Sequence, residues 1–465
     1  MPRPVQTQQC LRKHHRIHSS QSGGLFVSLH PAHHALLHYL TNDGKCMLIT
    51  LYTNMAVQDD LDVRLDNVFQ VDGDEGSLIQ QSYYYDLDEF NEVMNVHNTD
   101  SNLSILDINA RSLVKNFNEL SSILADLPSS LDIITVEETW LSEPLEPLVQ
   151  MKEYTFIAKH KNKCKEGGGI GIYVRNGIEY RLRDDLICPT EFKDLFDYMF
   201  IEIKQEAPLK NILVGVIYRP PGGDTVNTLT NHLKKKLLPK LNKENKTIVL
   251  TSDMNINLLQ CSNHKPSAFY YDTLLTNGFL PKITSPTRVT HNTATLIDHI
   301  FANESKDNQS FSGTITSSMS DHYFNFIFLK NSIKTEQPKT VTYRPFTEAN
   351  ITKFNKALNN TDFSRILESN DPNDAYKRLI NIYNDTLDKI IPLKTVRFNK
   401  YKHSINPWVS KEILLSIKYR DKLHSKIKKA KTKSQLITLE KSYNDYREFL
   451  HKKIKSAKRN YENAL

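Results

Sequence analysis

Cysteine is scarce in this chain, and the few that occur do not form a recognisable framework. There are five, at positions 10, 46, 164, 188 and 261, and no two of them form a CxxC pair. An odd number without close pairs argues against a zinc module and against the disulfide framework of a small secreted domain. We therefore expect the chain to work in a reducing, intracellular compartment.

Long apolar runs are also missing. No stretch reaches the roughly 18 apolar residues that a membrane-spanning helix needs. The first residues include Arg3, Arg12 and Arg16 among many His and Gln, where a signal peptide would have an apolar segment. We expect no membrane contact and no secretory leader.

Charge is distributed unevenly, although the net charge is only +7. Residues 391–465 contain 20 Lys and Arg against 6 Asp and Glu, whereas residues 1–390 contain 40 against 47. The basic character therefore belongs to the C-terminal segment. Such a segment binds polyanions through counterion release. The alternative, a solvated helix surface, is equally open on charge alone.

The 465 residues are enough for two or three domains, and the composition changes twice along the chain. Residues 1–100 combine a cluster of seven His between His14 and His38 with an acidic run from Asp59 to Glu75. Neither shows a helical or strand period, so we expect a mostly disordered region with at most one short helix. Irregular spacing makes metal binding by the His cluster the weaker hypothesis.

Residues 101–332 alternate short β-rich runs with polar turns and a few amphipathic segments. Strands are predicted at 103–110, 131–140, 167–176, 197–204, 211–221, 246–255, 295–303 and 323–330. Helices are predicted at 113–127, 226–243 and 266–277. Several strands are apolar almost throughout, which indicates burial on both faces. We expect an α/β fold in which two packed sheets are covered by helices, a four-layer α-β-β-α sandwich.

Residues 333–465 are expected to form a linker and a basic helical extension. Pro338 and Pro345 mark the linker, and Pro407 precedes the last helical segment. Helical patterns cover 347–366, 371–390 and a nearly continuous stretch at 408–462. A pair of helices or a helical arm should follow the sandwich.

Polar residues gather where the predicted strands end, and this is the main functional signal. They are Asn109, Glu137, Glu138, Tyr218, Arg219, Asp253, Asn255, Asp298, Ser320, Asp321 and His322. Strand ends at one edge of a sandwich converge, so these groups should meet over one crevice. Carboxylates and carboxamides suit a hard cation such as Mg²⁺. A His paired with Asp moves protons or contacts phosphate, and Tyr and Arg at the same rim stabilise phosphate charge.

Each residue taken singly has a plainer interpretation. Asp253 after a strand is more often a turn former, and Tyr218 alone fits a core aromatic. His299 lies inside a strand, where alternation turns it away from Asp298, so we interpret it as structural. The same alternation should turn Glu137 to the face opposite Glu138, and it is left out of the catalytic set. Only the ordered set is specific.

The ordered set resembles a known family. DINARSL, EETWL, YRPP, SDMN, LIDHIF and the final SDH occur in the order seen in the endonuclease/exonuclease/phosphatase superfamily, the DNase I-like fold. The phrases ETWLS, GGGIGIYV, YRPP and SPTRVTHNTATLIDHIFAN are similar to the endonuclease domain of non-LTR (LINE-like, Jockey/CR1-type) retrotransposon proteins. The stretch INPWVSKEILLSIKYRDKL is similar to the spacer that precedes reverse transcriptase in those proteins.

The resemblance implies a role for each matching position. Glu138, helped by Asn109, is expected to hold the divalent metal, Mg²⁺ or alternatively Mn²⁺, with Asp321 a further ligand candidate. Asp253 is expected to orient or deprotonate the attacking water, and Asn255 to position it. The metal and the polar donors then act on a phosphate that becomes more negative in the transition state.

The phosphate side of the site follows from the same resemblance. His322, oriented by Asp298, is expected to contact phosphate oxygens and stabilise the pentacovalent transition state, and Tyr218 is expected to lie against the phosphate. DNA contacts are expected at Arg219, Thr287, Arg288 and Ser320.

Two departures from the family pattern stand out. Ser252 occupies the position before the DxN aspartate, where the family usually has Gly, so the backbone approach there is expected to differ slightly. No FADD- or YADD-type reverse transcriptase signature is found in the 465 residues. We expect a truncated element copy, or a gene model cut at a domain boundary.

The sequence thus predicts a Mg²⁺-dependent endonuclease that nicks target DNA to leave a 3′-hydroxyl, acting in the nucleus. Element RNA is a second candidate partner, through the basic C-terminal region. The alternative function is a catalytically idle retroelement remnant that binds nucleic acid through that region. A phosphatase of the same fold, acting on a phosphoinositide or sphingolipid, is disfavoured by the TRVTHNTATLIDHIF phrase. We expect the fragment 95–335 to retain the nicking activity.

Overall fold

The computed structural model describes residues 81–99, 102–160, 167–192, 194–205, 209–222, 225–303, 310–330, 340–367, 371–397 and 406–464, together with the backbone of four strands closer to the N-terminus. The chain divides into two compact units, Met1–Ser77 and Leu78–Leu465.

The first unit contains a four-stranded antiparallel sheet in the order β1-β2-β3-β4. Its strands are β1 (His15–Arg16), β2 (Leu25–Leu29), β3 (Ala35–Leu40) and β4 (Cys46–Leu51). These strands differ from the disorder expected for residues 1–100. The acidic run and the side chains of the His cluster lie outside the described residues.

One sheet of the second unit has seven strands in the order β5-β18-β19-β6-β7-β9-β8. They are β5 (Tyr83–Tyr85), β6 (Leu103–Asn109), β7 (Ile133–Glu137), β8 (Tyr154–Lys159), β9 (Ile170–Arg175), β18 (Phe311–Ile315) and β19 (Phe324–Leu329). The central strands β6 and β7 are parallel and place Asn109 beside Glu137. Their carboxyl ends therefore lie at the same edge of the sheet.

The other sheet has six strands in the order β10-β11-β12-β13-β17-β14. They are β10 (Tyr180–Leu182), β11 (Asp197–Ile203), β12 (Ile212–Tyr218), β13 (Thr247–Asp253), β14 (Leu280–Pro281) and β17 (Asp298–Ala302). Asp253 pairs with Tyr218 on the parallel neighbour β12 and with Asp298 on the antiparallel neighbour β17. This register brings three predicted site residues to one edge.

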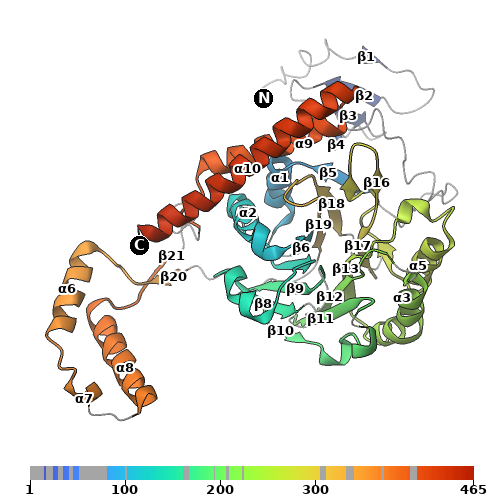
Figure 1. Ribbon diagram of the computed structural model, residues 1–465. Coiled ribbons are helices and arrows are strands. Elements are labelled where there is room, and N and C mark those ends of the chain that lie inside the picture. Colours follow the sequence, from blue (N-terminus) through green and yellow to red (C-terminus); the bar gives the residue numbers. More distant parts are fainter. Residues whose placement is uncertain are drawn as a thin grey trace, which may run out of the picture. The chain divides into compact units, whose positions relative to one another are not determined.

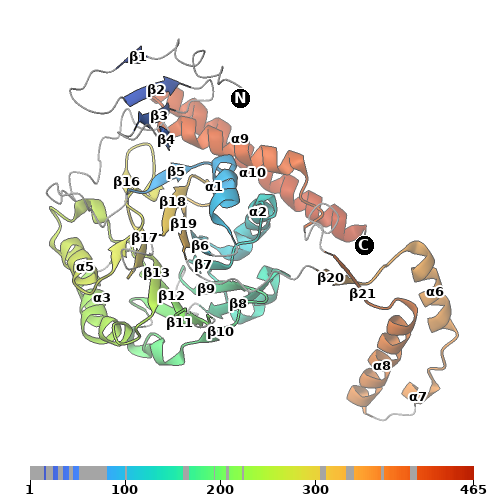
Figure 2. The same cartoon turned by 180° about the vertical axis from the view of Figure 1, so that it is seen from behind.

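Helices cover the outer face of each sheet, and Figures 1 and 2 show α1 and α2 on one side of the strands and α3 and α5 on the other. The helices are α1 (Leu87–His97), α2 (Leu113–Asp126), α3 (Val226–His232), a π-helical segment (Leu233–Leu237), α4 (Leu238–Leu241) and α5 (Lys265–Thr276). Short 3₁₀ turns span Glu143–Val149, Asp184–Leu186, Thr190–Phe192 and Leu258–Gln260. The result is the four-layer α-β-β-α sandwich that the sequence predicted.

Alternation along the strands explains this layering. Leu106 and Ile108 of β6 pack with Leu113 and Leu120 of α2 in one buried cluster. On the six-stranded sheet, the Tyr270 ring of α5 lies 6.3 Å from the Phe301 ring in a T-shaped arrangement. Each outer sheet face is therefore closed by a helix, as the apolar strands require.

The sandwich begins before the boundary at residue 100 that the sequence suggested. Strand β5 pairs in parallel with β18, where Tyr85 lies beside Ile315. Helix α1 begins at a capping box: Asp86 accepts from the amide of Glu89, and the Glu89 side chain accepts from the amide of Asp86. Phe90 and Met94 of this helix are each 1% exposed. A three-residue strand gives no readable alternation, so the sequence did not reveal it.

All eight predicted strands of residues 101–332 are present, and so are the three predicted helices, the second of which contains the π segment. Besides β5, the structure adds β8, β10, β14 and β18, and the short β15 (Arg288–Val289) and β16 (Ala294–Thr295). Strands β15 and β16 form a hairpin in which Arg288 pairs with Thr295.

The C-terminal region is helical, as expected. It contains β20 (Thr340–Tyr343), α6 (Glu348–Asn359), α7 (Ser364–Leu367), α8 (Pro372–Ile390), β21 (Lys394–Arg397), α9 (Lys411–Lys428) and α10 (Lys433–Asn463). β20 and β21 form an antiparallel pair. No helix within the described residues is both long and apolar enough to cross a membrane.

The predicted stretch 408–462 is a pair of helices, broken where Thr432 begins α10 by accepting from the amide of Gln435. This pair packs against the sandwich. Ile413 and Ile417 of α9, and Leu450 and Ile454 of α10, belong to the same buried cluster as α2. The helix pair therefore forms part of the hydrophobic core of the second unit.

Candidate active site

The site is built where strand ends of the two sheets face each other. Asn109 ends β6 of the seven-stranded sheet, and Asp253 ends β13 of the six-stranded sheet. The amide Nδ2 of Asn109 donates to Oδ2 of Asp253 over 2.8 Å. Both side chains are buried, Asn109 at 3% and Asp253 at 0% exposure. This hydrogen bond joins the two sheets at the edge that the sequence identified.

Asn109 also orients Glu138. Its Nδ2 donates to Oε1 of Glu138 over 3.3 Å, while its Oδ1 accepts from the backbone amide of Arg111. The amide oxygen thus has one hydrogen-bond donor and keeps a second lone pair, while the NH₂ group faces the two carboxylates. Asn109 acts here as a donor that holds Glu138 and Asp253 together.

Glu138 follows β7 in a left-handed backbone conformation, with φ of 47°. Such a conformation is uncommon for a residue other than Gly and breaks the strand alternation. Glycine-rich backbone supports the turn, because the amides of Thr139 and Trp140 donate to the carbonyls of Gly169 and Gly168. The Glu138 carboxylate accepts from Tyr218 Oη over 3.4 Å and from Trp140 Nε1 over 3.2 Å.

Tyr218, at the end of β12, is buried at 5% exposure. Burial is the main cause that raises the pKa of its hydroxyl, and the charges of Glu138 and Asp253 raise it further. The phenol therefore remains a hydrogen-bond donor near neutral pH.

Asp253 is also held by a residue that follows its own strand β13. Asn255, in a left-handed conformation with φ of 49°, donates from Nδ2 to Oδ2 of Asp253 over 3.1 Å and to the carbonyl of Arg219 over 2.9 Å. Burial raises the pKa of Asp253 well above its usual value, and the charge of Asp298 raises it further. The predicted pair Asp253 and Asn255 is thus brought together.

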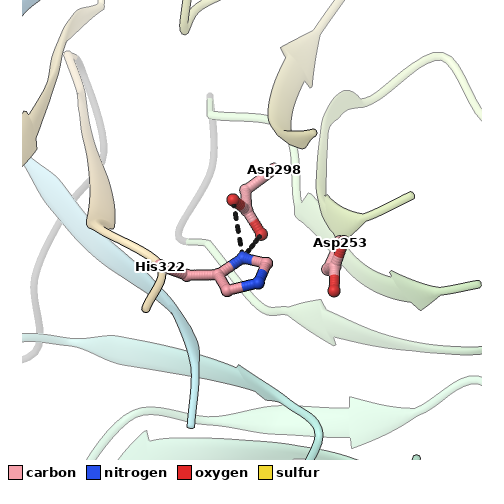
Figure 3. Close-up of side chains that lie close together, drawn as sticks. All are labelled: Asp253, Asp298 and His322. Carbon is pink, nitrogen blue, oxygen red and sulfur yellow. Dashed lines mark hydrogen bonds and ion pairs between the residues drawn. The ribbon is translucent and has the colours of Figure 1, made fainter. Parts of the chain in front are cut away.

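His322 forms an ion pair with Asp298. Its Nδ1 lies 2.9 Å from Oδ1 and 3.0 Å from Oδ2 of Asp298, and Thr287 Oγ1 donates to Oδ2 over 2.5 Å. Figure 3 shows Asp298, Asp253 and His322 converging, and their nearest ligand-type atoms lie within 4.8 Å of one another. Burial alone lowers the pKa of His322, but the charges of Asp298, Asp253 and Asp321 raise it to about 9. The imidazole is therefore a cation at neutral pH.

The donor set can be tested against a hard divalent cation. Buried carboxylates crowd the site, and their mutual repulsion raises the pKa of Asp253; a cation relieves such repulsion. Among the described residues, Asp253, Asp298 and His322 place ligand-type atoms within 4.8 Å of one another, with Nδ1 of His322 engaged by Asp298. Glu138, which shares the Asn109 NH₂ group with Asp253, is a further carboxylate at this place.

Asp321, the further candidate ligand, has a different environment. Its Oδ2 lies 2.5 Å from Arg111 Nη1 and 2.6 Å from Arg288 Nη2. The arginine side chains are 50% and 40% exposed. Asp321 is therefore engaged by two arginines at the rim of the site, and Arg111 is a basic group that the sequence reasoning missed.

Three of the four predicted DNA contacts point inward. Arg219 is 3% exposed and donates to the carbonyls of Met254 and Asn255 over 2.7 and 2.8 Å. Thr287 is fully buried against Asp298. Ser320 Oγ donates to the carbonyl of Asn109 over 2.9 Å. These three residues organise the site, and of the four only Arg288 has a charged side chain that is partly exposed.

Glu137 occupies a position that the sequence did not predict. It pairs with Asn109 in the register of β6 and β7 and is 1% exposed, near Asp107 of the same sheet. Burial raises the pKa of Asp107 to about 7 and that of Glu137 well above its usual value. The charge of Asp253 raises the pKa of Glu137 further, so the Asp107–Glu137 pair lies close to the site. Alternation failed as a guide here because Glu138 leaves the strand conformation.

Two smaller expectations can also be compared with the structure. His299 is structural, as predicted: it is 1% exposed, and its Nε2 lies 3.2 Å from the carbonyl of Leu296. Ser252, in place of the usual Gly, is buried and donates from Oγ to the carbonyl of His299 over 3.2 Å. The position therefore accommodates a side chain.

Several solved structures are similar to this chain at low identity. One is the endonuclease domain of TRAS1, a telomere-specific non-LTR retrotransposon, at 12% identity and a TM-score of 0.38, covering 50% of this chain and 99% of that chain. Another is the AP endonuclease LMAP from Leishmania major, at 10% identity and a TM-score of 0.39, covering 50% of this chain and 88% of that chain. A third is the mannosyl-6-phosphatase Bt3783 from Bacteroides thetaiotaomicron VPI-5482, at 15% identity and a TM-score of 0.38, covering 49% of this chain and 99% of that chain.

A comparison with curated proteins finds no match to the sequence. The α-β-β-α sandwich is the DNase I-like fold that the sequence motifs predicted. The site residues, from Asn109 to His322, all lie within the segment of the chain that matches a known protein family. Residues 97–322 match the Endonuclease/Exonuclease/phosphatase family, whose members hydrolyse phosphodiesters or other phosphate esters.

Proposed function

We propose that the sandwich is a divalent-metal-dependent DNA endonuclease that nicks one strand and leaves a 3′-hydroxyl. One observation carries the proposal: His322, paired with Asp298, lies beside Asp253, which Asn109 links to Glu138 across the two sheets. These are the groups that phosphodiester hydrolysis needs, a cation for the phosphate and carboxylates for the water and the metal. The resemblance of SPTRVTHNTATLIDHIFAN to retrotransposon endonucleases supports DNA as the substrate.

His322 serves the phosphate. Its Nδ1 is engaged by Asp298, so the second nitrogen, Nε2, is the one left to donate to a phosphate oxygen. A fixed cation stabilises negative charge that develops on those oxygens in the transition state. Tyr218, whose pKa is raised by burial, keeps its proton and adds a second donor beside Glu138.

Asp253 serves the attacking water. A general base works best when its pKa approaches the working pH, and burial moves the pKa of Asp253 in that direction. Asn255 and Asn109 both donate to its Oδ2, which leaves Oδ1 to accept from the amide of Asn255 and from a water. The two amides thus orient the carboxylate.

Glu138 is the residue that would hold the metal, Mg²⁺ or Mn²⁺, next to the carboxylate of Asp253. A bound divalent cation would supply Lewis-acid stabilisation of the phosphate charge. Asn109 sets the spacing of the two carboxylates through its single NH₂ group.

The rim of the site is basic where DNA would approach. Arg111 and Arg288 both contact Asp321 and keep half-exposed guanidinium groups. Guanidinium groups suit the bidentate recognition of phosphate. The basic C-terminal region is proposed to add contacts to DNA or to element RNA, with the nucleus as the place of action.

The full chain is expected to convert supercoiled plasmid to the nicked form in the presence of Mg²⁺. Asp253→Ala and His322→Ala are expected to abolish this, whereas the exposed residues Asp272 and His451 provide matched alanine controls that remain active. Extension of the nicked product by a DNA polymerase tests for the 3′-hydroxyl. A folded, metal-loaded chain that leaves plasmid intact would overturn the endonuclease proposal.

The same protein preparation can be assayed for phosphatase activity, the alternative activity of this fold. Release of inorganic phosphate from a phosphoinositide without plasmid nicking would show that the substrate is the phosphoinositide and not DNA.

A further inference from the structure

The segment Ser317–His322, called here the catalytic loop, connects β18 to β19 and ends with the ion-paired histidine. On the side of the site, one hydroxyl holds this loop. Ser320 Oγ donates to the carbonyl of Asn109 over 2.9 Å and accepts from the amide of His322 over 3.1 Å. The position of His322 therefore also depends on the contacts that hold the rest of the catalytic loop.

On its other side the catalytic loop is held by helix α9. Oδ1 of Asp421 accepts from the backbone amide of Ser318 over 3.0 Å and from Oγ of the same serine over 2.5 Å. Ser318 is 3% exposed, so these bonds are shielded from water. A carboxylate that accepts two hydrogen bonds from one residue fixes both its backbone and its side chain.

Asp421 is itself fixed by a buried arginine. Arg420 is 1% exposed, and its Nε donates to Oδ1 of Asp421 over 3.0 Å. Its Nη1 lies 2.5 Å from Oε1 of Glu119 on α2. Removing one member of a buried ionic group leaves an uncompensated charge, so the fold is expected to keep all three partners together. It ties α9 to the sandwich at the point where Asp421 meets the loop.

A second contact holds the end of the catalytic loop. Tyr323 follows His322 directly, and its amide donates to the carbonyl of Thr287 over 2.8 Å. Lys428, seven residues after Asp421 and thus on the same face of α9, has Nζ 4.1 Å from the centre of the Tyr323 ring. Helix α9 therefore contacts the loop near its beginning and beyond its end.

We propose that Asp421 is a positioning residue for the proposed hydrolysis, and that the α9–α10 helix pair is required to hold His322 in its productive place. The inference rests on the proposed function of the site, but its structural part can be tested without turnover. It assigns to a segment beyond the family match at residues 97–322 a direct role in the geometry of the site.

The first readout is hydrogen exchange of the catalytic-loop amides in the full chain, without metal or DNA. Asp421→Ala is expected to raise exchange of the Ser318–Asp321 amides about tenfold or more, because the loop loses its outer acceptor. Asp421→Asn keeps an acceptor oxygen and is expected to stay close to the parent protein. Asp445→Ala, at an exposed acid on α10, is the matched control and should leave the exchange unchanged.

The second readout is the split between kcat and KM in plasmid nicking. Asp421→Ala is expected to lower kcat by about 10- to 100-fold, as small misplacements of reacting groups do, with KM changed less than about twofold. Asp421→Asn should recover most of the kcat. Ser318→Ala removes only the hydroxyl donor and provides a milder variant if Asp421→Ala fails to fold.

The outcomes separate the two proposals. Unchanged loop exchange in Asp421→Ala, or in Ser318→Ala if the former does not fold, would overturn the positioning role. So would a kcat equal to that of the parent protein. Equal kcat losses in the Ala and Asn variants would assign Asp421 a charge effect and equally overturn it. If the parent chain itself does not nick DNA, the proposed function fails, and the exchange measurement alone still decides whether α9 fixes the loop.

Discussion

The imidazole Nδ1 of His322 lies 2.9 Å from Oδ1 of Asp298, and both side chains are at most 5% exposed. The charges of Asp298, Asp253 and Asp321 outweigh burial and raise the pKa of His322 to about 9. Since the folded pKa lies above the unfolded value near 6.5, the pair stabilises the fold fully below pH 6.5. This contribution is lost as the pH rises through about 9.

The first prediction concerns this titration. In metal-free protein, an NMR titration of the His322 ring protons should show a midpoint near 9. Asp298→Asn should move the midpoint downward, because burial then acts with less opposing charge. A midpoint for His322 at or below 6.5 in the parent protein would contradict the charged state on which its role depends.

The second prediction concerns metal removal. Glu138 and Asp253 are drawn together by one amide of Asn109, and burial raises the pKa of Asp253. A ligand that binds only the folded state stabilises it by about 2.7 kcal/mol at a hundredfold excess over its Kd. Mg²⁺ or Mn²⁺ should therefore raise the melting temperature by several degrees, and EDTA should reverse this.

Glu138→Gln should remove most of that increase, because the variant keeps the shape of the side chain and loses its charge. Glu179→Gln, at an exposed glutamate on the surface, should retain it. An equal Mg²⁺ effect in the parent chain and in Glu138→Gln would place the cation elsewhere.

Much of the fold could be predicted because its strands are apolar runs bounded by polar turns. β6, β7, β12 and β13 are buried on both faces, so the sequence shows them clearly. β5 could not be found, since three tyrosines in a row show no alternation. Its partner β18 lies more than two hundred residues away in the chain, and only the tertiary pairing explains it.

The sequence predicted which residues form the site better than it predicted where their side chains point. Asp253, Asp298 and His322 meet because parallel and antiparallel partners end at one edge. The sequence could not reveal that Glu138 adopts a left-handed conformation. Nor could it reveal that Glu137, beside Asn109 in the register of β6 and β7, is buried on the site side of the sheet. Nor could it reveal that Arg219 turns inward to backbone carbonyls, because an arginine at a strand end has many accessible rotamers.

The third prediction concerns the smallest active fragment, and it revises the expectation for residues 95–335. A start at residue 95 removes β5 and most of α1, including Phe90, whose ring lies 4.8 Å from that of Phe326. An end at residue 335 removes α9 and α10 and uncovers their contacts on α2. Loss of a single large core side chain costs about 3–5 kcal/mol. Fragment 95–335 should therefore be unfolded or aggregated.

A fragment of residues 78–465, which matches the second compact unit, should fold and retain the nicking activity of the full chain. Thermal unfolding followed by circular dichroism, with the nicking assay, compares the two fragments directly. A cooperative transition and full activity for 95–335 would show that α1 and the α9–α10 pair are dispensable.

The last prediction concerns the basic C-terminal region, where point substitutions are more informative than deletion. Deleting residues 391–465 would also remove Ile413 and Leu450 from the core and Asp421 from the catalytic loop. Lys422, Lys426 and Lys429 are exposed on or just after α9. Their replacement by Gln removes charge without touching the core. If each contacts one DNA phosphate, the slope of log K against log salt should fall by about 0.9 per lysine.

Binding is best measured in the Asp253→Ala background, so that cleavage does not interfere. The matched control replaces Lys235, Lys236 and Lys243, which are exposed on the far sheet's helix layer. Both triple variants change the net charge equally, so a general charge effect would flatten both slopes alike. A slope that falls only in the α9 variant assigns these lysines to the DNA path. Equal slopes in the α9 variant and in the parent chain would leave α9 with its structural contacts to the catalytic loop alone.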